Sequence, residues 1–200
     1  MKWSVCYKER KTWGGSLLMK SRRKETWSFA IVLTIGIVIA FIVRSFIFAP
    51  YQVQGQSMAP NLEEKNKLIV SKMTDVSQLE RFDIIVFDAP DSDEQYIKRV
   101  IGLPGDNIRM TNDILYINGK PHDEEYLKKE RKNLAFSYTG DFTLSELTGH
   151  ETVPKGYVFV LGDNRKVSKD SRYFGFLSEK EIVGKAIWRY WPLPSMGRLN

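Results

Sequence analysis

Two residues of this chain, Ser57 and Lys98, have the types and surroundings that catalysis needs. Ser57 stands in the short stretch QSMAP (56–60), which follows soon after the only segment apolar enough to enter a membrane. A serine hydroxyl becomes a nucleophile when a nearby base takes its proton. A serine close to a proline is also typical of an ordinary turn, so this stretch alone leaves both interpretations open.

Lys98 is the candidate base for this serine. It lies within YIKRVI (96–101), a run rich in β-branched and aromatic residues, where strand alternation places it on the same face as Tyr96 and Val100. A desolvated amine has a lowered pKa and can accept a proton near neutral pH. The alternative is a structural lysine on an edge strand, with its charged end in solvent.

Histidine is disfavoured as the base. His122 and His150 are the only histidines, and both fall in a segment rich in charged and small polar residues. Gly55 to Ala59 is a near miss of the G-x-S-x-G elbow and lacks its strand-to-helix setting. The run His122 to Glu125 is interpreted as exposed polar surface. The sequence contains no H-E-x-x-H, paired C-x-x-C or P-loop motif, so we expect neither a metal nor a cofactor.

A polar loop, GDNRKVSKDSR (162–172), directly follows the apolar run YVFVL (157–161). Such a loop is either ordinary surface or a set of hydrogen-bonding groups that orient a catalytic pair. Within it, Asp170 and Arg172 can form an ion pair.

The elements that must position these residues are short strands. Turn residues separate them: Asn118-Gly119 favours a type I′ hairpin, and Gly102 to Asp106 predicts a tight connection. No strong ten-residue helical pattern alternates with the strands, so we expect a mostly β, antiparallel body. The predicted strands are 67–71, 83–87, 96–101, 114–117, 157–161 and 182–188.

Residues 121–153 differ from this pattern. They combine the charged run HDEEYLKKERK with Ser, Thr and Gly, and they offer little to bury. We interpret them as part of a solvated insertion between two halves of the core.

The basic charge is concentrated at the N-terminus. Residues 1–26 contain eight Lys or Arg and two Glu, which accounts for the whole net charge of +6 and leaves the remaining residues neutral. A neutral body without a basic stripe argues against a nucleic-acid partner. The apolar run 27–43 has no charge, and the basic residues before it predict a cytoplasmic N-terminus and an exported body.

A cleavable secretory leader is the alternative for this apolar run. We favour an uncleaved anchor, because the run is long and its exit reads Ile47-Phe48-Ala49-Pro50, with a bulky residue where a leader needs a small one and a proline at the would-be new terminus. Arg44 is expected to lie at the interface, and about thirteen residues separate it from Ser57. A fully extended linker of that length reaches roughly 45 Å, which keeps the nucleophile close to the outer leaflet. Cys6 falls on the cytoplasmic side, so the body has no disulfide.

Four stretches carry a resemblance to a known family. In order and spacing, they resemble the motif set of bacterial type I signal peptidases, Ser/Lys-dyad enzymes of peptidase family S26, in their Gram-positive form. Each stretch is weakly specific alone, but the four together cover nearly the whole exported body. They are QSMAP (56–60), RFDIIVF (81–87), YIKRVIGLPGD (96–106) and GDNRKVSKDSR (162–172).

The resemblance implies that Ser57 is the nucleophile and Lys98 the general base. It also implies that Ser168 hydrogen-bonds and orients the Lys98 amine, and that Asp170 and Arg172 form a supporting ion pair. The positions that would line small apolar pockets for the substrate are Val53, Met58, Tyr96 and Ile97.

Two positions depart from the family pattern. Gly55 stands where some members have a serine that helps to hold the oxyanion, so the donor here is expected to be backbone, most simply the Ser57 N–H. Lys166 stands where an acidic residue is frequent.

The predicted organisation is a cytoplasmic segment 1–26, a transmembrane anchor 27–46, a catalytic core 47–106 with 154–195, and an inserted β-rich subdomain 107–153. The predicted activity is removal of signal peptides from exported preproteins after small residues, at the plasma membrane. Signal peptides, membrane lipid and proximity to the secretion translocase are the expected partners. The alternatives are another Ser/Lys self-processing protease and a non-catalytic, membrane-tethered binder of exported segments.

Overall fold

The computed structural model describes residues 27–41, 48–72, 78–132 and 137–199. The chain divides into two units, Met1–Ser45 and Phe46–Asn200. In the first unit, residues 27–41 form a helix whose apolar side chains are exposed along its whole length. Within the described ranges, no helix is both long and apolar enough to cross a bilayer. The predicted segment 1–26 and the end of the predicted anchor, including Arg44, lie outside the described residues.

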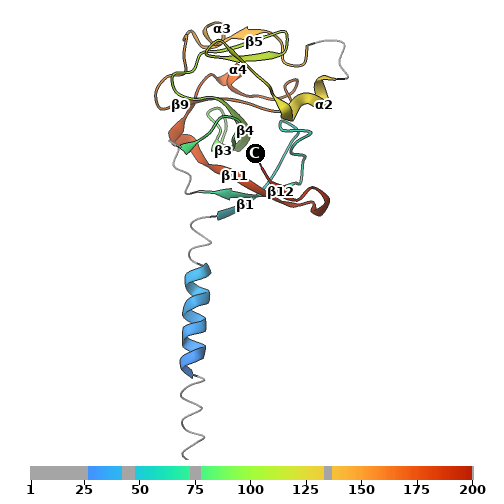
Figure 1. The fold of residues 1–200 in the computed structure, drawn as a ribbon. Coiled ribbons are helices and arrows are strands. Elements are labelled where there is room, and N and C mark those ends of the chain that lie inside the picture. Colours follow the sequence, from blue (N-terminus) through green and yellow to red (C-terminus); the bar gives the residue numbers. More distant parts are fainter. Residues whose placement is uncertain (1–26, 42–47, 73–77, 133–136, 200) are drawn as a thin grey trace, which may run out of the picture. The chain divides into compact units, whose positions relative to one another are not determined.

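The second unit is built on two antiparallel sheets (Figure 1). Among the described residues, the larger sheet has eight strands in the order β1-β2-β11-β3-β4-β9-β10, with β12 paired to β11, and the smaller has the order β7-β6-β5-β8. The larger sheet contains β1 (Phe48–Gln52), β2 (Lys67–Ser71), β3 (Ile84–Asp88), β4 (Gln95–Gly102), β9 (Tyr157–Leu161), β10 (Leu177–Ser178), β11 (Ile182–Trp191) and β12 (Gly197–Arg198). The smaller contains β5 (Ile108–Thr111), β6 (Ile114–Ile117), β7 (Lys120–His122) and β8 (Phe142–Thr143).

Helices in the second unit are short. They are η2 (Glu125–Leu127), α2 (Lys128–Arg131), α3 (Leu144–Thr148), α4 (Ser171–Phe174), η3 (Glu179–Glu181) and η4 (Leu193–Ser195). The mostly β, antiparallel architecture predicted from the sequence is therefore confirmed. All six predicted strands occur, with bounds that match or shift by a few residues, whereas the shorter strands such as β8 and β10 carried no usable pattern.

The burial of β2 and β3 matches the apolar patterns from which these strands were predicted. β3 is buried at four successive residues, as expected for a strand covered on both faces, and β2 alternates between buried and partly exposed residues. The predicted hairpin at Asn118-Gly119 is confirmed: both residues have positive φ, and Ile117 pairs with Lys120.

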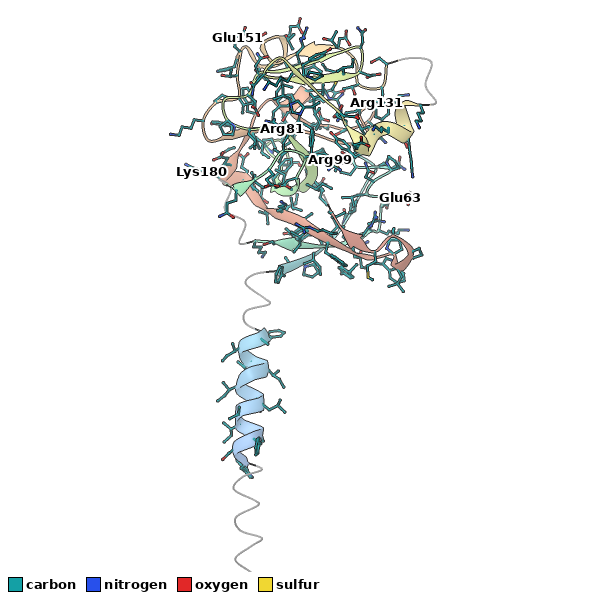
Figure 2. All side chains as sticks on the ribbon, in the orientation of Figure 1. Glu63, Arg81, Arg99, Arg131, Glu151 and Lys180 are labelled. Carbon is teal, nitrogen blue, oxygen red and sulfur yellow. The ribbon has the colours of Figure 1, made fainter. Side chains whose placement is uncertain are left out.

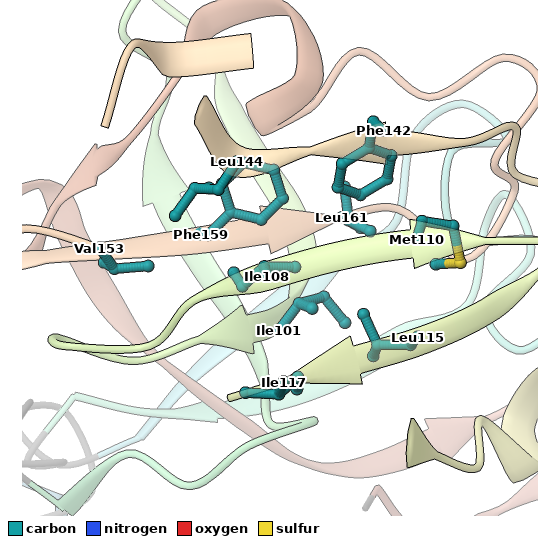
Figure 3. Close-up of a cluster of buried hydrophobic side chains, with 10 residues drawn as sticks. All are labelled: Ile101, Ile108, Met110, Leu115, Ile117, Phe142, Leu144, Val153, Phe159 and Leu161. Carbon is teal, nitrogen blue, oxygen red and sulfur yellow. The ribbon is translucent and has the colours of Figure 1, made fainter. Parts of the chain in front are cut away.

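One buried cluster joins the two sheets (Figure 3). Ile101 and Phe159 come from the larger sheet, whereas Ile108, Leu115 and Phe142 come from the smaller one. The smaller sheet and α3 lie at one end of the body, and β1 and β12 lie at the other (Figure 1). The smaller sheet falls within residues 107–153, but the shared core means that its strands pack directly on the larger sheet.

The sequence interpretation of residues 121–153 as having little to bury was wrong. Leu127, Leu144 and Val153 are almost completely buried, and so is the carboxylate of Glu124. The few apolar residues of this segment pack inward, but the many charged residues around them in the sequence hide their pattern. Glu124 is buried because it has cationic partners.

Candidate active site

Ser57 sits in a tight turn that follows β1. Val53 is fixed by two backbone hydrogen bonds, from its N–H to Asn66 O at 2.8 Å and from the Lys65 N–H to its carbonyl at 2.9 Å. The turn then closes through the Leu62 N–H, which donates to Met58 O at 2.8 Å. Ser57 is half-buried, so its hydroxyl is held in place while it stays accessible.

Lys98 reaches this hydroxyl from β4. Its Nζ donates to Ser57 Oγ at 2.8 Å and to the Ile97 carbonyl at 3.1 Å. β4 runs between β3 and β9, Lys98 pairs with Ile85, and its side chain is 3% exposed. The alternative of an edge-strand lysine with its charge in solvent is therefore wrong. Lys98 Nζ also lies 5.0 Å from the centre of the Tyr96 ring, in agreement with the predicted shared face.

Burial changes the acidity of this amine. Desolvation lowers the pKa of Lys98 from 10.5 to about 8, and the negative charges of Asp170, Asp163 and Asp91 oppose that shift. A substantial fraction of the amine is thus neutral near physiological pH. Once neutral, Nζ can accept the Ser57 proton across the same 2.8 Å contact.

A groove of about 510 Å³ opens beside the pair. Ser57 and Lys98 both line it, as do the four residues expected to form substrate pockets: Val53, Met58, Tyr96 and Ile97. Val53 and Met58 are nearly fully buried and form an apolar floor. Neither histidine is among the lining residues. Across the described part of the chain, no group of three or more His, Cys, Asp or Glu side chains is placed to hold a metal ion.

The loop 162–172 packs against the nucleophile. The Asn164 N–H donates to Ser57 O at 3.0 Å, and a Cβ on Gly162 would lie 2.5 Å from that same carbonyl oxygen. The predicted ion pair within the loop is present: Arg172 Nε and Nη2 donate to the two carboxylate oxygens of Asp170 at 2.8 and 2.9 Å. Asp170 also accepts the Gly162 N–H at 3.0 Å, which ties the start of the loop to its end.

Ser168 lies in the polar loop without the hydrogen bond that was expected. It is buried against Gly162, and its Oγ has no hydrogen-bond partner among the described residues. The predicted bond from Ser168 to the Lys98 amine is therefore not formed here. The amine instead directs its hydrogen bonds to Ser57 and Ile97.

The two departures from the family pattern differ in their relation to the groove. Gly55 is exposed, has φ +74° and lines the groove without a hydroxyl to offer. Lys166 is exposed, with its Nζ 6.0 Å from the centre of the Tyr138 ring, and it does not line the groove.

Asp163 is a central residue of the site that the sequence interpretation did not single out. Its carboxylate is completely buried and pairs with Arg99, whose Nε and Nη2 donate at 2.9 and 2.8 Å. Asn61 Nδ2 donates to the same carboxylate at 2.9 Å. Asp163 thus connects the serine turn, the lysine strand and the polar loop. The sequence does contain a signal for it: Arg99 lies within an apolar strand next to the candidate base, and a buried arginine needs an acidic partner.

A second buried pair was missed because it joins distant segments. Glu124 Oε1 accepts a hydrogen bond from Arg165 Nη2, and neither side chain is exposed to solvent. The interpretation of His122 to Glu125 as exposed surface was therefore wrong for Glu124, whereas Asp123 and Glu125 are exposed.

Comparisons with known proteins identify the family of this chain. Residues 25–191 match the family model described as signal peptidase, peptidase S26. The chain is 50% identical over 175 residues to signal peptidase I of Bacillus caldolyticus, covering 86% of this chain and 93% of that protein. It is 43% identical over 176 residues to signal peptidase IB of Staphylococcus aureus, covering 85% and 92% of the two chains.

A solved structure extends the likeness to the fold. A signal peptidase I from Enterococcus faecalis V583 superposes with a TM-score of 0.52 at 46% identity, covering 54% of this chain and 96% of that one. The family match spans most of the chain, and several relatives exceed 40% identity over most of their own length. The chain therefore belongs to the signal peptidase family, peptidase S26.

Proposed function

We propose that this protein is a membrane-bound signal peptidase that removes N-terminal signal peptides from exported preproteins with Ser57 as nucleophile and Lys98 as base. The observation that carries the proposal is the 2.8 Å contact between Lys98 Nζ and Ser57 Oγ, made by a buried lysine at the wall of an accessible groove. Family membership supplies the reaction class, a serine peptidase.

The reaction is acyl transfer in two stages. Neutral Lys98 takes the Ser57 proton as Oγ attacks the carbonyl carbon that precedes the scissile bond, and the resulting ammonium protonates the departing amine. The mature protein leaves, and the signal peptide stays bound as an ester on Ser57. Lys98 then activates a water molecule that hydrolyses this ester and regenerates the hydroxyl. The backbone N–H of Ser57 is the proposed oxyanion donor, because Gly55 offers no hydroxyl.

Specificity for small residues follows from the floor of the groove. Val53 and Met58 are almost completely buried and line the groove together with the nucleophile, and Tyr96 and Ile97 line it from β4. The family resemblance implies that such residues form shallow pockets. A methyl side chain fits a shallow pocket, whereas a larger one has to push against a closely packed floor. We therefore assign these four residues to recognition of an Ala-x-Ala type sequence.

Membrane attachment is the second part of the proposal. The helix over residues 27–41 is apolar and exposed on all sides, a pattern that requires a non-aqueous environment or a partner. In the second unit, exposed apolar side chains occur on β1, β11 and η4, namely Phe48, Trp188, Trp191 and Leu193. We propose a single-pass anchor with a cytoplasmic N-terminus, contact with lipid, and a place near the secretion translocase.

The test is to incubate the purified full-length protein with one preprotein and to sequence the new N-terminus of the product. We expect a single cut after a small residue, and no product with Ser57→Ala at an unchanged melting temperature. Cleavage by Ser57→Ala would remove the nucleophile assignment. A Ser57→Ala protein that still fulfils the cellular role would favour the non-catalytic binder.

A further inference from the structure

Glu124 is buried although the residues on both sides of it in the chain are exposed. It follows β7 in the predicted insertion, between exposed Asp123 and exposed Glu125, yet it is 0% exposed. Its Oε1 accepts hydrogen bonds from Arg165 and from the Tyr126 hydroxyl, the latter at 2.6 Å, and its Oε2 accepts from Arg131 Nη2. In Figure 2, the labelled Arg131 lies on α2, at the side of the body.

Arg165 transmits this contact to the catalytic loop. While Nη2 bonds to Glu124, the Arg165 Nε donates to the Gly162 carbonyl at 2.9 Å. The Arg165 carbonyl in turn accepts from Arg172 Nη2 at 2.8 Å, and Arg172 holds Asp170. Both side chains of the Glu124–Arg165 pair are completely buried, so the pair has no water to replace a lost partner.

The segment held in this way touches the nucleophile directly. Gly162 fits against Ser57 O with no room for a Cβ, and the next-but-one residue, Asn164, donates its N–H to the same oxygen. A shift of the loop therefore moves the Ser57 backbone. The Lys98 amine is carried by β4, which is paired with β3 on one side and β9 on the other. Arg99 of the same strand bonds to Asp163, but this strand pairing is expected to make Lys98 move less than the loop does.

We infer that Glu124 is a positioning residue for catalysis: through Arg165 it fixes residues 162–164 and thereby the aim of Ser57 at the Lys98 amine. The inference rests on the proposed peptidase function, and it extends the catalytic assembly into the segment 107–153. Glu124 lies 41 residues from Arg165 in the chain and does not line the groove.

The charge state of the pair supports this role. Burial by itself would raise the pKa of Glu124, but the positive charge and hydrogen bonds of Arg165, with Tyr126 and Arg131, bring its pKa below the ordinary value. The carboxylate is thus ionised wherever the enzyme works. Neutralising it leaves a buried guanidinium without its counter-ion, and such a guanidinium is expected to turn toward other acceptors and pull the loop with it.

The experiment compares kcat and KM of the full-length wild type and Glu124→Gln on one preprotein, each corrected for the folded fraction. We expect kcat to fall roughly 10- to 100-fold, because small misplacements of a reacting pair have effects of that size. KM should change less than about threefold, because Glu124 does not line the groove. The midpoint of the acid limb of the pH–rate profile should not change, because the variant alters the orientation of Ser57 and not the pKa of Lys98.

Arg131→Met is the matched control. It removes the other charged partner of Glu124 on α2 and leaves the Glu124–Arg165 contact in place, so we expect kcat close to that of the wild type even where the melting temperature falls. Equal kcat for Glu124→Gln and wild type, or an equal loss for Arg131→Met, would overturn the inference.

A third variant covers failure to fold. If Glu124→Gln does not fold, Glu124→Asp, which keeps the charge but retracts it by one methylene, is judged by the same criterion. If the wild type itself does not cleave the preprotein, the proposed peptidase function is wrong, and the positioning role falls with it. If the wild type cleaves and Glu124→Gln cleaves equally well, only the positioning role is wrong.

Discussion

Lys98 combines two requirements that normally conflict, a long cationic side chain and nearly complete burial. The conflict is resolved by a partly neutral amine, because desolvation brings the pKa of Lys98 to about 8. The neutral form is the one that the proposed mechanism requires, and it predominates above the pKa. Three aspartates nearby, Asp170, Asp163 and Asp91, keep the pKa from falling further.

Lys98→Arg separates a base from a structural cation. Arginine keeps the charge but does not release its proton at working pH, so we expect a loss of roughly two to four orders of magnitude in kcat. In the wild type, the rate should rise with pH and be half-maximal near about 8. The measurement is preprotein cleavage between acidic and alkaline pH. An active Lys98→Arg enzyme with the wild-type pH profile would contradict the Ser/Lys dyad.

Gly162 shows how little space lies behind the nucleophile. A Cβ at this position would meet Ser168 Oγ at 2.1 Å and Ser57 O at 2.5 Å. We expect Gly162→Ala to displace the serine and to reduce kcat about 100-fold or more, in line with the cost of small misplacements. Initial rates at saturating preprotein measure the effect.

Gly197→Ala is the control for this change. A Cβ on Gly197 meets nothing within 4 Å, so kcat should be unchanged. Equal activity of Gly162→Ala and the wild type would show that the loop does not fix the position of Ser57.

At the scale of elements, β4 and the loop after β9 do most of the positioning. β4 presents Lys98 to the serine and Arg99 to Asp163, with successive residues facing opposite sides of the strand. In Figure 2, the labelled Arg99 lies inside the body. The residues that act on Ser57 therefore come from a central strand and a loop pinned by ion pairs.

The smaller sheet is part of the same folding unit, because its strands share a buried cluster with Ile101 and Phe159. Phe159→Ala should destabilise the body by about 3–5 kcal/mol, the usual cost of truncating a buried Phe. Because the cluster is shared, we expect both sheets of the variant to unfold in one cooperative transition, at a lower denaturant concentration than in the wild type. Circular dichroism and tryptophan fluorescence measure this transition.

Tyr157→Ala on the same strand is the control, since Tyr157 is 41% exposed, and it should cost about 1 kcal/mol or less. Two separate transitions in the Phe159→Ala protein would instead support an independent subdomain over residues 107–153.

At the scale of the whole molecule, the distribution of charge and apolar residues sets the proposed topology. Residues 1–26 carry the entire net charge, and the apolar run 27–43 follows directly. Such a charge step favours a cytoplasmic N-terminus.

Protease added outside protoplasts should digest the body beyond residue 50 and spare the first 26 residues. Detection with antibodies against each end measures the outcome, and detergent-lysed cells give the control in which both ends are digested. A protected body would reverse the proposed orientation and separate the enzyme from exported substrates.

The strands, the hairpin at Asn118-Gly119 and the candidate pair Ser57 and Lys98 were all accessible to sequence analysis. Alternation, turn residues and motif order are local properties, and each is written within a few adjacent residues. The possible ion pair between Asp170 and Arg172 was also visible within the polar loop, and it is present. The family resemblance added its supporting role.

Only the tertiary structure decided how deeply charges are buried and with whom they pair. Ser57 and Lys98 meet across 41 residues of chain, Arg99 and Asp163 across 64, and Glu124 and Arg165 across 41. A charged residue in a polar stretch looks solvated until its counter-ion is known, which is why the sequence alone predicts a surface position for Glu124. Ser168 shows the reverse, because its position was expected but its hydroxyl makes no hydrogen bond within the described chain. Burial of a charge depends on a partner from another element, and no local pattern encodes that partner.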